Sequence, residues 1–521
     1  MKLSRKSGIL LHPTSLPGTP GIGTFGKVAR DFVDFLANSK TRLWQVLPLG
    51  PTGYGDSPYQ SFSTFALNPL LIDLDDLVEW GWADPADIQI PEYIKTEGNV
   101  DFGSVVYWKV PLLNTIASRA EKLGGAQFKK EFAEFESKND FWLTDYALFM
   151  SIKTAYDKDG MWNKAWPKEL AGRDKDALAK WQGAHAKEIK AYKIIQFFAF
   201  RQWTALHEYA NASGVEIIGD IPIFVSPDSA DVWANQKFFQ LNKNGVPKVV
   251  AGVPPDYFSP TGQLWGNPLY DWKALKEDNY KWWIKRVEHN LALADYIRID
   301  HFRGFDTYWA VPYGAENAVK GKWLKGPGIA FFNELKKQLG ELPLIAEDLG
   351  IITDAVRVLR DKTGLPGMKI LQFGFDTAEF SGGALLNSFL PHNFTTANCV
   401  VYTGTHDNDT TQGSLNAMND ECLCLVASYV KGRRVECDEA WAMRSSGELC
   451  RSLVSLCYSS CAGFAIIPEQ DLFGFGSDCR MNTPGTGQAN WSWRMRSDML
   501  YGADADSKSA WLKELNILYA R

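Results

Sequence analysis

A series of short apolar runs, separated by helix-like segments, most constrains the fold of this chain. Eight runs have the length and β-branched content of buried strands. They lie at Gly8–Leu11, Leu43–Leu47, Val215–Gly219, Tyr296–Ile299, Leu344–Ala346, Met368–Phe373, Cys399–Tyr402 and Phe464–Ile467. Helical patterns follow several runs, as at 29–36 and 354–360. Alternating strands and helices predict an α/β fold, and eight strands indicate a (β/α)8 TIM barrel.

The spacing of the runs predicts where the barrel is interrupted. The range 75–210, between the second and third runs, is rich in charged, helix-forming stretches, so we expect a mostly helical insertion there. The range 235–272 is dense in glycine, proline and aromatic residues and is expected to form a rim or lid excursion. Residues 1–521 are then one catalytic barrel with inserted subdomains.

Composition excludes several classes of function. A net charge of −6 argues against nucleic acid or an anionic membrane as the main partner. No run approaches the roughly 20 apolar residues that span a bilayer. Aromatic residues make up 13% of the chain, which suits binding to the faces of sugars but also the packing of a large core.

The cysteine pattern predicts neither a metal site nor an exported protein. All eight cysteines lie in the last quarter of the chain, with no CxxC pair and no Cys/His cluster at zinc spacing. The N-terminus lacks the long apolar segment of a secretion signal. We therefore expect reduced thiols, a cytoplasmic location, no metal and no cofactor.

Three acidic residues stand at or just past the C-terminal ends of predicted strands: Asp300, Glu347 and Asp407. Parallel barrels carry out their chemistry at the mouth formed by these strand ends. Two carboxyl groups that flank a sugar bond are the usual means of cleaving it, one as nucleophile and one as acid/base. The pattern predicts an enzyme that acts on glycosidic bonds.

The surroundings of Asp300 and Glu347 predict different protonation. Strand alternation places Arg298 on the same face as Asp300, which favours an ionised carboxylate; the alternative is a buried ion pair at the barrel floor. Glu347 emerges from an apolar strand, which raises its pKa and suits proton donation. The alternative is that Glu347 or Asp348 caps the next helix.

The remaining candidates have both a catalytic and a structural interpretation. Asp407 and His406 are suited to contact sugar hydroxyls and to stabilise positive charge; a metal site is disfavoured because adjacent residues rarely point at one ion. Asp220, which we place at the end of the third strand, binds either the sugar or its own loop. The loop Gly252–Ser259 forms either a lid or a rigid surface loop, and glycines in Gly50–Tyr59 allow a glucan close to the backbone.

These residues lie in long motifs that identify a family. The chain closely resembles 4-α-glucanotransferases of the amylomaltase and disproportionating-enzyme type, glycoside hydrolase family 77. The similarity runs in one order from about residue 7 to beyond residue 490. The matching motifs are Gly50–Tyr59, Gly219–Ile223, Gly252–Ser259, Arg298–Gly304, Ala346–Gly350, Gly404–Asn408, Asn482–Thr486 and Asn490–Arg494.

The resemblance implies roles for particular residues. Asp300 corresponds to the nucleophile, Glu347 to the acid/base and Asp407 to the transition-state stabiliser. The implied substrate ligands are Tyr59, Asp220, Trp265, Arg298, His301, His406 and Asn490. By the same resemblance the Gly252–Ser259 loop covers the active site, and a separate C-terminal β-domain is absent.

The expected function is transfer of α-1,4-glucan segments between maltooligosaccharides with retention of configuration, through a covalent β-glycosyl-enzyme on Asp300. The alternatives are an α-amylase-like hydrolase and a catalytically inactive glucan-binding protein. The expected partners are maltooligosaccharides and α-1,4-glucans, with no nucleic acid or membrane, and the expected form is a monomer or weak homo-oligomer.

Overall fold

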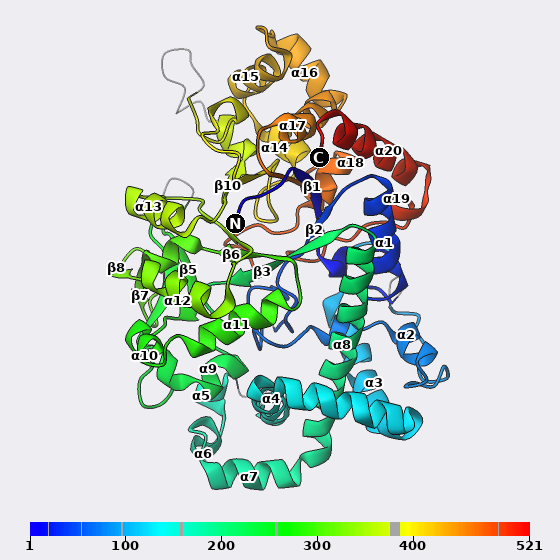
Figure 1. Cartoon of the computed structure of the whole chain (residues 1–521), viewed down its shortest axis with the longest axis vertical. Helices are drawn as coiled ribbons and strands as arrows, with labels where there is room; N and C mark the ends of the chain where they lie inside the picture. Colours follow the sequence, from blue (N-terminus) through cyan, green and yellow to red (C-terminus); the bar gives the residue numbers. More distant parts are fainter. Residues whose placement is uncertain are drawn as a thin grey trace.

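An eight-stranded parallel sheet forms the centre of the molecule (Figure 1). The computed structural model describes residues 1–18, 20–53, 55–94, 97–156, 160–255, 259–375, 386–487 and 489–521. The strands are β1 (Lys6–Leu10), β2 (Leu43–Gln45), β3 (Glu216–Pro222), β6 (Tyr296–Asp300), β9 (Leu344–Ala346), β10 (Gly367–Ile370), β11 (Cys399–Tyr402) and β12 (Phe464–Pro468). They pair in chain order, and β12 pairs with β1. Ala346 N donates to Pro366 O at 2.9 Å between β9 and β10, which completes the (β/α)8 barrel.

All eight predicted strands are present, but several of their ends differ from the prediction; the second, for example, ends at Gln45 and not at Leu47. The third strand continues to Pro222 because β3 pairs with β6 as far as Pro222 opposite Asp300. Asp220 therefore lies inside this strand and not at its end. The predicted strand 368–373 ends at Ile370, since Leu371–Phe375 turn into a 3-10 helix whose Gln372 N donates to Thr403 O at 3.3 Å.

Helices cover the outside of the barrel, as an α/β pattern predicts. In α1 (Lys27–Asn38), Phe32, Val33 and Leu36 are buried, so one apolar stripe faces the sheet. Helix α13 (Asp354–Thr363) begins where the Thr353 hydroxyl accepts Val356 N–H, and it ends at Gly364 with φ +71°. The other helices between β3 and β10 are α9 (Ala230–Ala234), α10 (Trp272–Glu277), α11 (Lys281–Leu291) and α12 (Ile329–Leu339).

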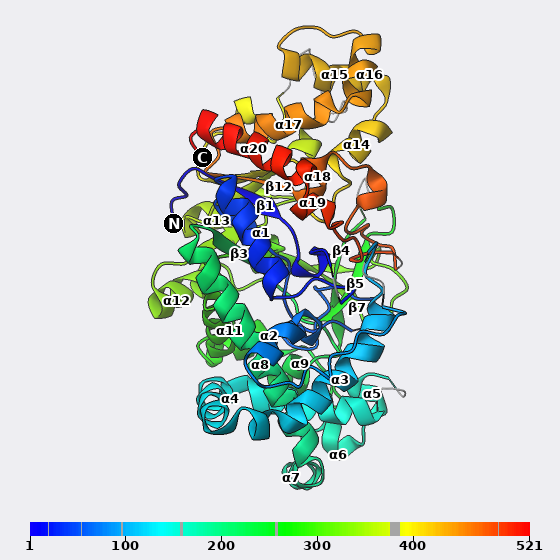
Figure 2. The same ribbon diagram turned by 90° about the vertical axis from the view of Figure 1, so that its right-hand side faces the viewer.

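Two groups of helices extend from the barrel toward opposite ends of the long axis of the molecule (Figures 1 and 2). The range 75–210 forms one group, and α3 and α4 pack against α8 there. Its helices are α2 (Leu74–Glu79), α3 (Phe102–Leu123), α4 (Gly125–Tyr156), α5 (Trp162–Ala165), α6 (Lys168–Ala171), α7 (Lys175–Ala184) and α8 (Ala186–Ala212). The other group, between β11 and β12, is α14 (Thr411–Ala417), α15 (Asp420–Lys431), α16 (Cys437–Ser445) and α17 (Glu448–Ser459).

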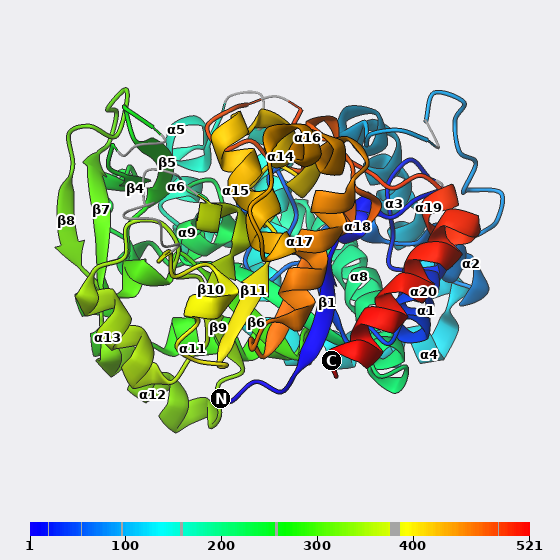
Figure 3. The same cartoon turned by 90° about the horizontal axis from the view of Figure 1, so that it is seen from above.

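A four-stranded antiparallel sheet stands beside the barrel (Figure 3). Its strands, in the order β5-β4-β7-β8, are β5 (Gln263–Pro268), β4 (Val249–Val253), β7 (Thr307–Pro312) and β8 (Lys322–Lys325). The stretch around Trp265, which we expected to be a rim loop, is thus a strand paired with β4. Residues 256–258 of the loop expected to cover the site lie outside the described residues.

Beyond β12 the described chain contains the helices α18 (Glu469–Phe473), α19 (Asp498–Tyr501) and α20 (Ala503–Leu518), a loop between α18 and α19, and no further strand. None of the described helices combines the length and the apolar character needed to cross a membrane. The described side chains contain no group of three or more His, Cys, Asp or Glu placed to hold a metal ion. None of the eight cysteines, all of which lie in the described part of the chain, forms a disulfide.

Candidate active site

Three neighbouring strands, β3, β6 and β9, bring acidic residues to the same end of the barrel. Asp300 is the last residue of β6, and Glu347 follows directly after β9. The register places Asp220 opposite Arg298 and Ile299 opposite Ala346. Two backbone hydrogen bonds extend this register, from Glu347 N to Ile299 O at 3.1 Å and from Phe302 N to Glu347 O at 3.0 Å. Parallel pairing thus holds Asp300 and Glu347 on adjacent strand ends.

Arg298 joins two of the carboxylates. Its Nη1 donates to Asp220 Oδ2 at 2.5 Å and its Nη2 donates to Asp300 Oδ1 at 2.8 Å. Burial lowers the pKa of Arg298, but the two carboxylates more than offset this and raise it well above its usual range. The predicted pairing of Arg298 with Asp300 is confirmed. Asp300 is 28% exposed, so this pair does not lie on a closed barrel floor.

Asp220 supports Arg298 from the neighbouring strand. Its side chain is fully buried, and Oδ2 also accepts the Tyr59 hydroxyl at 2.8 Å. Burial raises the pKa of Asp220 to about 7, while Arg298 acts in the opposite direction. Among the described residues, Asp220 Oδ1 has no hydrogen-bond partner. Tyr59, Asp220 and Arg298 therefore form one buried chain that ends at Asp300.

Glu347 is placed to hold a proton. Burial is the main cause that raises its pKa to about 8, and the nearby charge of Asp300 adds to it. Its Oε2 accepts His301 N–H at 2.7 Å and Oε1 accepts Leu349 N–H at 2.9 Å, which lowers the pKa by less. The predicted rise in pKa is confirmed. Neither Glu347 nor Asp348 caps α13, because Thr353 occupies that position. Asp348 instead accepts hydrogen bonds from Arg360 and from Met368 N–H.

The backbone at His301 adopts a conformation that is unusual for a residue other than glycine. Its φ of +53° lies in the left-handed region, which costs about 1–3 kcal/mol and is found mainly where function requires it. In this conformation the His301 N–H reaches Glu347. Burial lowers the pKa of His301 to about 4, so the ring is neutral, and it meets Trp265 edge-on at 4.8 Å between centroids. Its Nε2 has no partner within the described chain.

Asp407 approaches from the loop after β11. Its side chain is 46% exposed, and Asn482 Nδ2 donates to its Oδ1 at 2.6 Å. The preceding His406 is buried, which lowers its pKa. Its ring stacks on Tyr59, with 5.1 Å between the ring centroids and 18° between the ring planes. Trp491 lies 5.9 Å from the same imidazole. These three rings connect the loops that follow β2, β11 and β12.

Asn490 is engaged within its own loop. Its Oδ1 accepts Thr483 N–H at 2.9 Å, and its Nδ2 donates to Thr486 O at 2.9 Å. Sequence reasoning missed Asn482 as the direct partner of Asp407, along with Arg480, which donates to the Asp407 carbonyl at 2.6 Å. The motif Asn482–Thr486 was the one available signal, because neither periodicity nor spacing relates residue 482 to residue 407.

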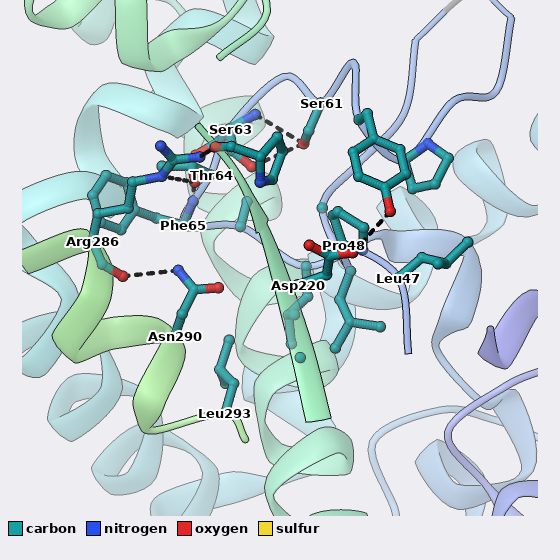
Figure 4. A pocket seen from close by; sticks show the side chains of 18 of the residues that line it. Leu47, Pro48, Ser61, Ser63, Thr64, Phe65, Asp220, Arg286, Asn290 and Leu293 are labelled. Atoms are coloured by element: carbon teal, nitrogen blue, oxygen red, sulfur yellow. Dashed lines mark hydrogen bonds between the residues drawn. The ribbon is translucent and has the colours of Figure 1, made fainter. Parts of the chain in front are cut away.

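A cavity of about 50 Å³ borders Tyr59 and Asp220 (Figure 4). Asp220 lies on one side of it, and Thr64 with Arg286 lies on another, joined by a 2.7 Å hydrogen bond. This volume suits roughly a few water molecules and is far below the ~300 Å³ or more of a typical ligand site. Asp300 and Glu347 do not line it. The cavity therefore lies behind Asp220, away from Asp300 and Glu347.

Comparisons with known proteins agree with this geometry. The family whose description is 4-alpha-glucanotransferase, glycoside hydrolase family 77, matches residues 11–499. The 4-alpha-glucanotransferase of Thermus thermophilus is 47% identical, with 95% of each chain covered. That of a Synechocystis species is 46% identical, over 99% of this chain and 98% of its own. An amylomaltase structure from Streptococcus agalactiae, in complex with acarbose, superposes with a TM-score of 0.91 at 37% identity and covers 99% of this chain and 100% of its own.

The family match and the structural match thus both extend over nearly the whole chain, including the strand ends that carry the acids. A more distant amylomaltase from Corynebacterium glutamicum, 17% identical with a TM-score of 0.74, shares the fold; it is matched over 98% of this chain and 75% of its own. The chain belongs to the 4-alpha-glucanotransferase family, glycoside hydrolase family 77, and is an enzyme with that activity.

Proposed function

We propose that the protein transfers segments of α-1,4-glucans between maltooligosaccharides with retention of configuration, through a covalent intermediate on Asp300. The contrast between two adjacent carboxyl groups carries this proposal. Asp300 receives a 2.8 Å hydrogen bond from a buried guanidinium, whereas the pKa of Glu347 is raised to about 8. Asp300 is thus paired with a guanidinium, and Glu347 keeps a proton at neutral pH, which fits the nucleophile and the acid of a double displacement.

In the first step, Asp300 attacks the anomeric carbon of the donor glucan while Glu347 gives its proton to the departing oxygen. The glycosidic bond breaks and a β-glycosyl ester forms on Asp300. In the second step, the 4-hydroxyl of an acceptor glucan attacks the same carbon, and Glu347 takes back a proton. Two inversions restore the α configuration, and the carboxyl groups of a retaining enzyme lie about 5–5.5 Å apart.

The remaining residues are proposed to bind sugar or to orient the acids. Asp407, exposed at the mouth, stabilises the positive charge that develops on the ring. His301 and His406 are neutral, since burial lowers the pKa of each, so they are suited to hydrogen-bond sugar hydroxyls. Trp265, Tyr59, Asp220, Arg298 and Asn490 complete the proposed set of substrate ligands.

Incubation with maltotriose alone tests the function. Transfer to a glucan yields glucose and a ladder of longer chains while the number of reducing ends stays constant. Steadily rising reducing ends would identify an α-amylase-like hydrolase instead. Binding without turnover would identify a glucan-binding protein.

Two variants test the assigned roles. Asp300→Asn is expected to lose transfer by on the order of 10⁴-fold or more, because the nucleophile is removed. Glu347→Gln is expected to lose about 10²–10⁴-fold with maltotriose, but less with α-glucosyl fluoride, whose leaving group needs no proton. Asp354→Asn, which changes a carboxyl that is 95% exposed on α13, is the control and should keep full activity. Transfer that survives in Asp300→Asn would disprove the assigned nucleophile.

A further inference from the structure

The loop that carries Asp407 spans two barrel elements. It leaves β11 at Thr403 and enters α14 at Thr411, with His406 and Asp407 between these ends. Loops of this kind are the more mobile parts of a fold unless they are tied down. A displacement of about 1 Å in a catalytic group can cost 10²-fold in rate, so the position of this loop matters for transfer.

One buried carboxylate binds both ends of this loop. Asp471 Oδ2 accepts the Thr403 hydroxyl at 2.5 Å and the Thr411 hydroxyl at 2.6 Å. Asp471 Oδ1 accepts the Thr411 backbone N–H at 2.7 Å. Asp471 is 2% exposed, and both threonines are 1% exposed. The two ends of the loop are therefore held at a single point in the core.

The fold places Asp471 where it can make these contacts. It belongs to α18, which follows directly on β12, and β12 pairs in parallel with β11. Burial raises the pKa of Asp471, and its hydroxyl and amide donors, Thr403 and Thr411, reduce that rise. Hydrogen bonds to an ionised acceptor are about twice as strong as neutral ones. Three such bonds offset part of the entropy lost when the loop is ordered.

Other contacts hold the same loop, among them those of Arg480 and Asn482 with Asp407. Gln372 Nε2 donates to Asp409 O at 2.9 Å, and Ser477 Oγ donates to Asp409 Oδ2 at 2.7 Å. Both bonds reach residue 409, on the helix side of Asp407. Gln372 also reaches the strand end, where its N–H donates to Thr403 O at 3.3 Å. Asp471 differs in that one carboxylate accepts three hydrogen bonds from Thr403 and Thr411.

We propose that Asp471 is a positioning residue for glucan transfer, which fixes the Thr403–Thr411 loop so that Asp407 meets the developing charge. The proposal rests on the role assigned above to Asp407. Asp471 itself touches no substrate. It acts through Thr403 and Thr411, and its loss should lower the turnover number more than substrate binding.

The double variant Thr403→Val/Thr411→Val removes both hydroxyls without changing side-chain shape and leaves the carboxylate in place. We expect kcat for maltotriose to fall about 10- to 100-fold, with KM changed less than about threefold, because the contact acts in the transition state. Asp471→Asn is the second variant and should have the same signature. Thermal unfolding of each variant establishes how much protein is folded, and kcat is expressed per folded molecule.

The matched control is Thr24→Val. Thr24 is also a buried threonine whose hydroxyl donates to a carboxylate, Asp73, at 2.6 Å, but it lies before α1 and Asp73 caps α2. It should lower stability and leave kcat per folded molecule unchanged. An equal fall of kcat in Thr24→Val, or an unchanged kcat in the double valine variant, would overturn the proposal.

A double-mutant cycle with Asp407→Asn separates this proposal from the proposed function. If Asp471 acts through Asp407, Asp471→Asn should lower kcat by a much smaller factor in the Asp407→Asn background than in the wild type. An equal factor in both backgrounds would disprove the positioning role. Full activity of Asp407→Asn would instead disprove the role of Asp407. α-Glucosyl fluoride is the substrate for the cycle, because it allows low rates to be compared.

Discussion

Two carboxyl groups on adjacent strand ends have different immediate surroundings. Asp300 faces a guanidinium and partial solvent, whereas Glu347 is half-buried and accepts two backbone N–H groups. Those N–H groups favour the anion, but burial and the charge of Asp300 outweigh them. The left-handed backbone of His301 provides one of the two donors. The protonation of Glu347 therefore depends on desolvation more than on its hydrogen bonds.

The raised pKa of Glu347 predicts the pH dependence of transfer. A general acid works in its protonated form, so activity requires a pH below the pKa of Glu347, which is about 8. We expect kcat/KM for maltotriose to fall tenfold per pH unit above about pH 8. With α-glucosyl fluoride as donor this limb should be weaker. A maltotriose profile that stays flat to alkaline pH would contradict the assignment of Glu347 as the acid.

At the scale of elements, the strands were predictable and the contacts between them were not. Short β-branched runs marked all eight strands, and alternation correctly placed Arg298 beside Asp300. The same pattern did not show that β3 continues past Asp220, because that extension depends on pairing with β6. The stretch around Trp265 was expected to be a loop and is a strand, since β4 supplies its partner.

Helix α3 offers a test of packing in the helical insertion. Leu113 is fully buried, whereas Leu123 on the same helix is 47% exposed. We expect Leu113→Ala to lower the free energy of unfolding by about 2–5 kcal/mol, because it leaves a cavity in the core. Leu123→Ala should cost less than about 1 kcal/mol. Denaturant unfolding measures both, and equal losses would contradict the burial that distinguishes the two positions.

At the scale of the whole molecule, residue 521 is bound to the first strand. Arg521 is 9% exposed and donates from Nη1 to Lys6 O at 3.2 Å. The same guanidinium donates to Tyr458 O at 2.7 Å and to Ser460 O at 3.1 Å. Burial lowers its pKa to about 10, so it stays charged at neutral pH. One side chain thus satisfies carbonyls from segments that are distant in the chain.

Removal of this guanidinium should destabilise the barrel as a whole. We expect Arg521→Ala to lower stability by about 2–4 kcal/mol, since Ala462 O loses this donor and Tyr458 O and Ser460 O keep only Arg5. Arg434→Ala, at a position 86% exposed, is the control and should be nearly neutral. Thermal unfolding compares the two, and a neutral Arg521→Ala would show that these carbonyls find other donors.

By itself, the sequence determined the barrel, its helical insertion and the acids at the strand ends. Periodicity and strand-end chemistry are local properties, so they can be read from neighbouring residues. Only the tertiary structure decided how these acids are supported. Asp220, Tyr59 and Arg298 form one hydrogen-bonded chain, and Asp471 binds both ends of the Asp407 loop. Such contacts join residues far apart in the chain, and hydrophobic packing brings them together without leaving a periodic trace in the sequence.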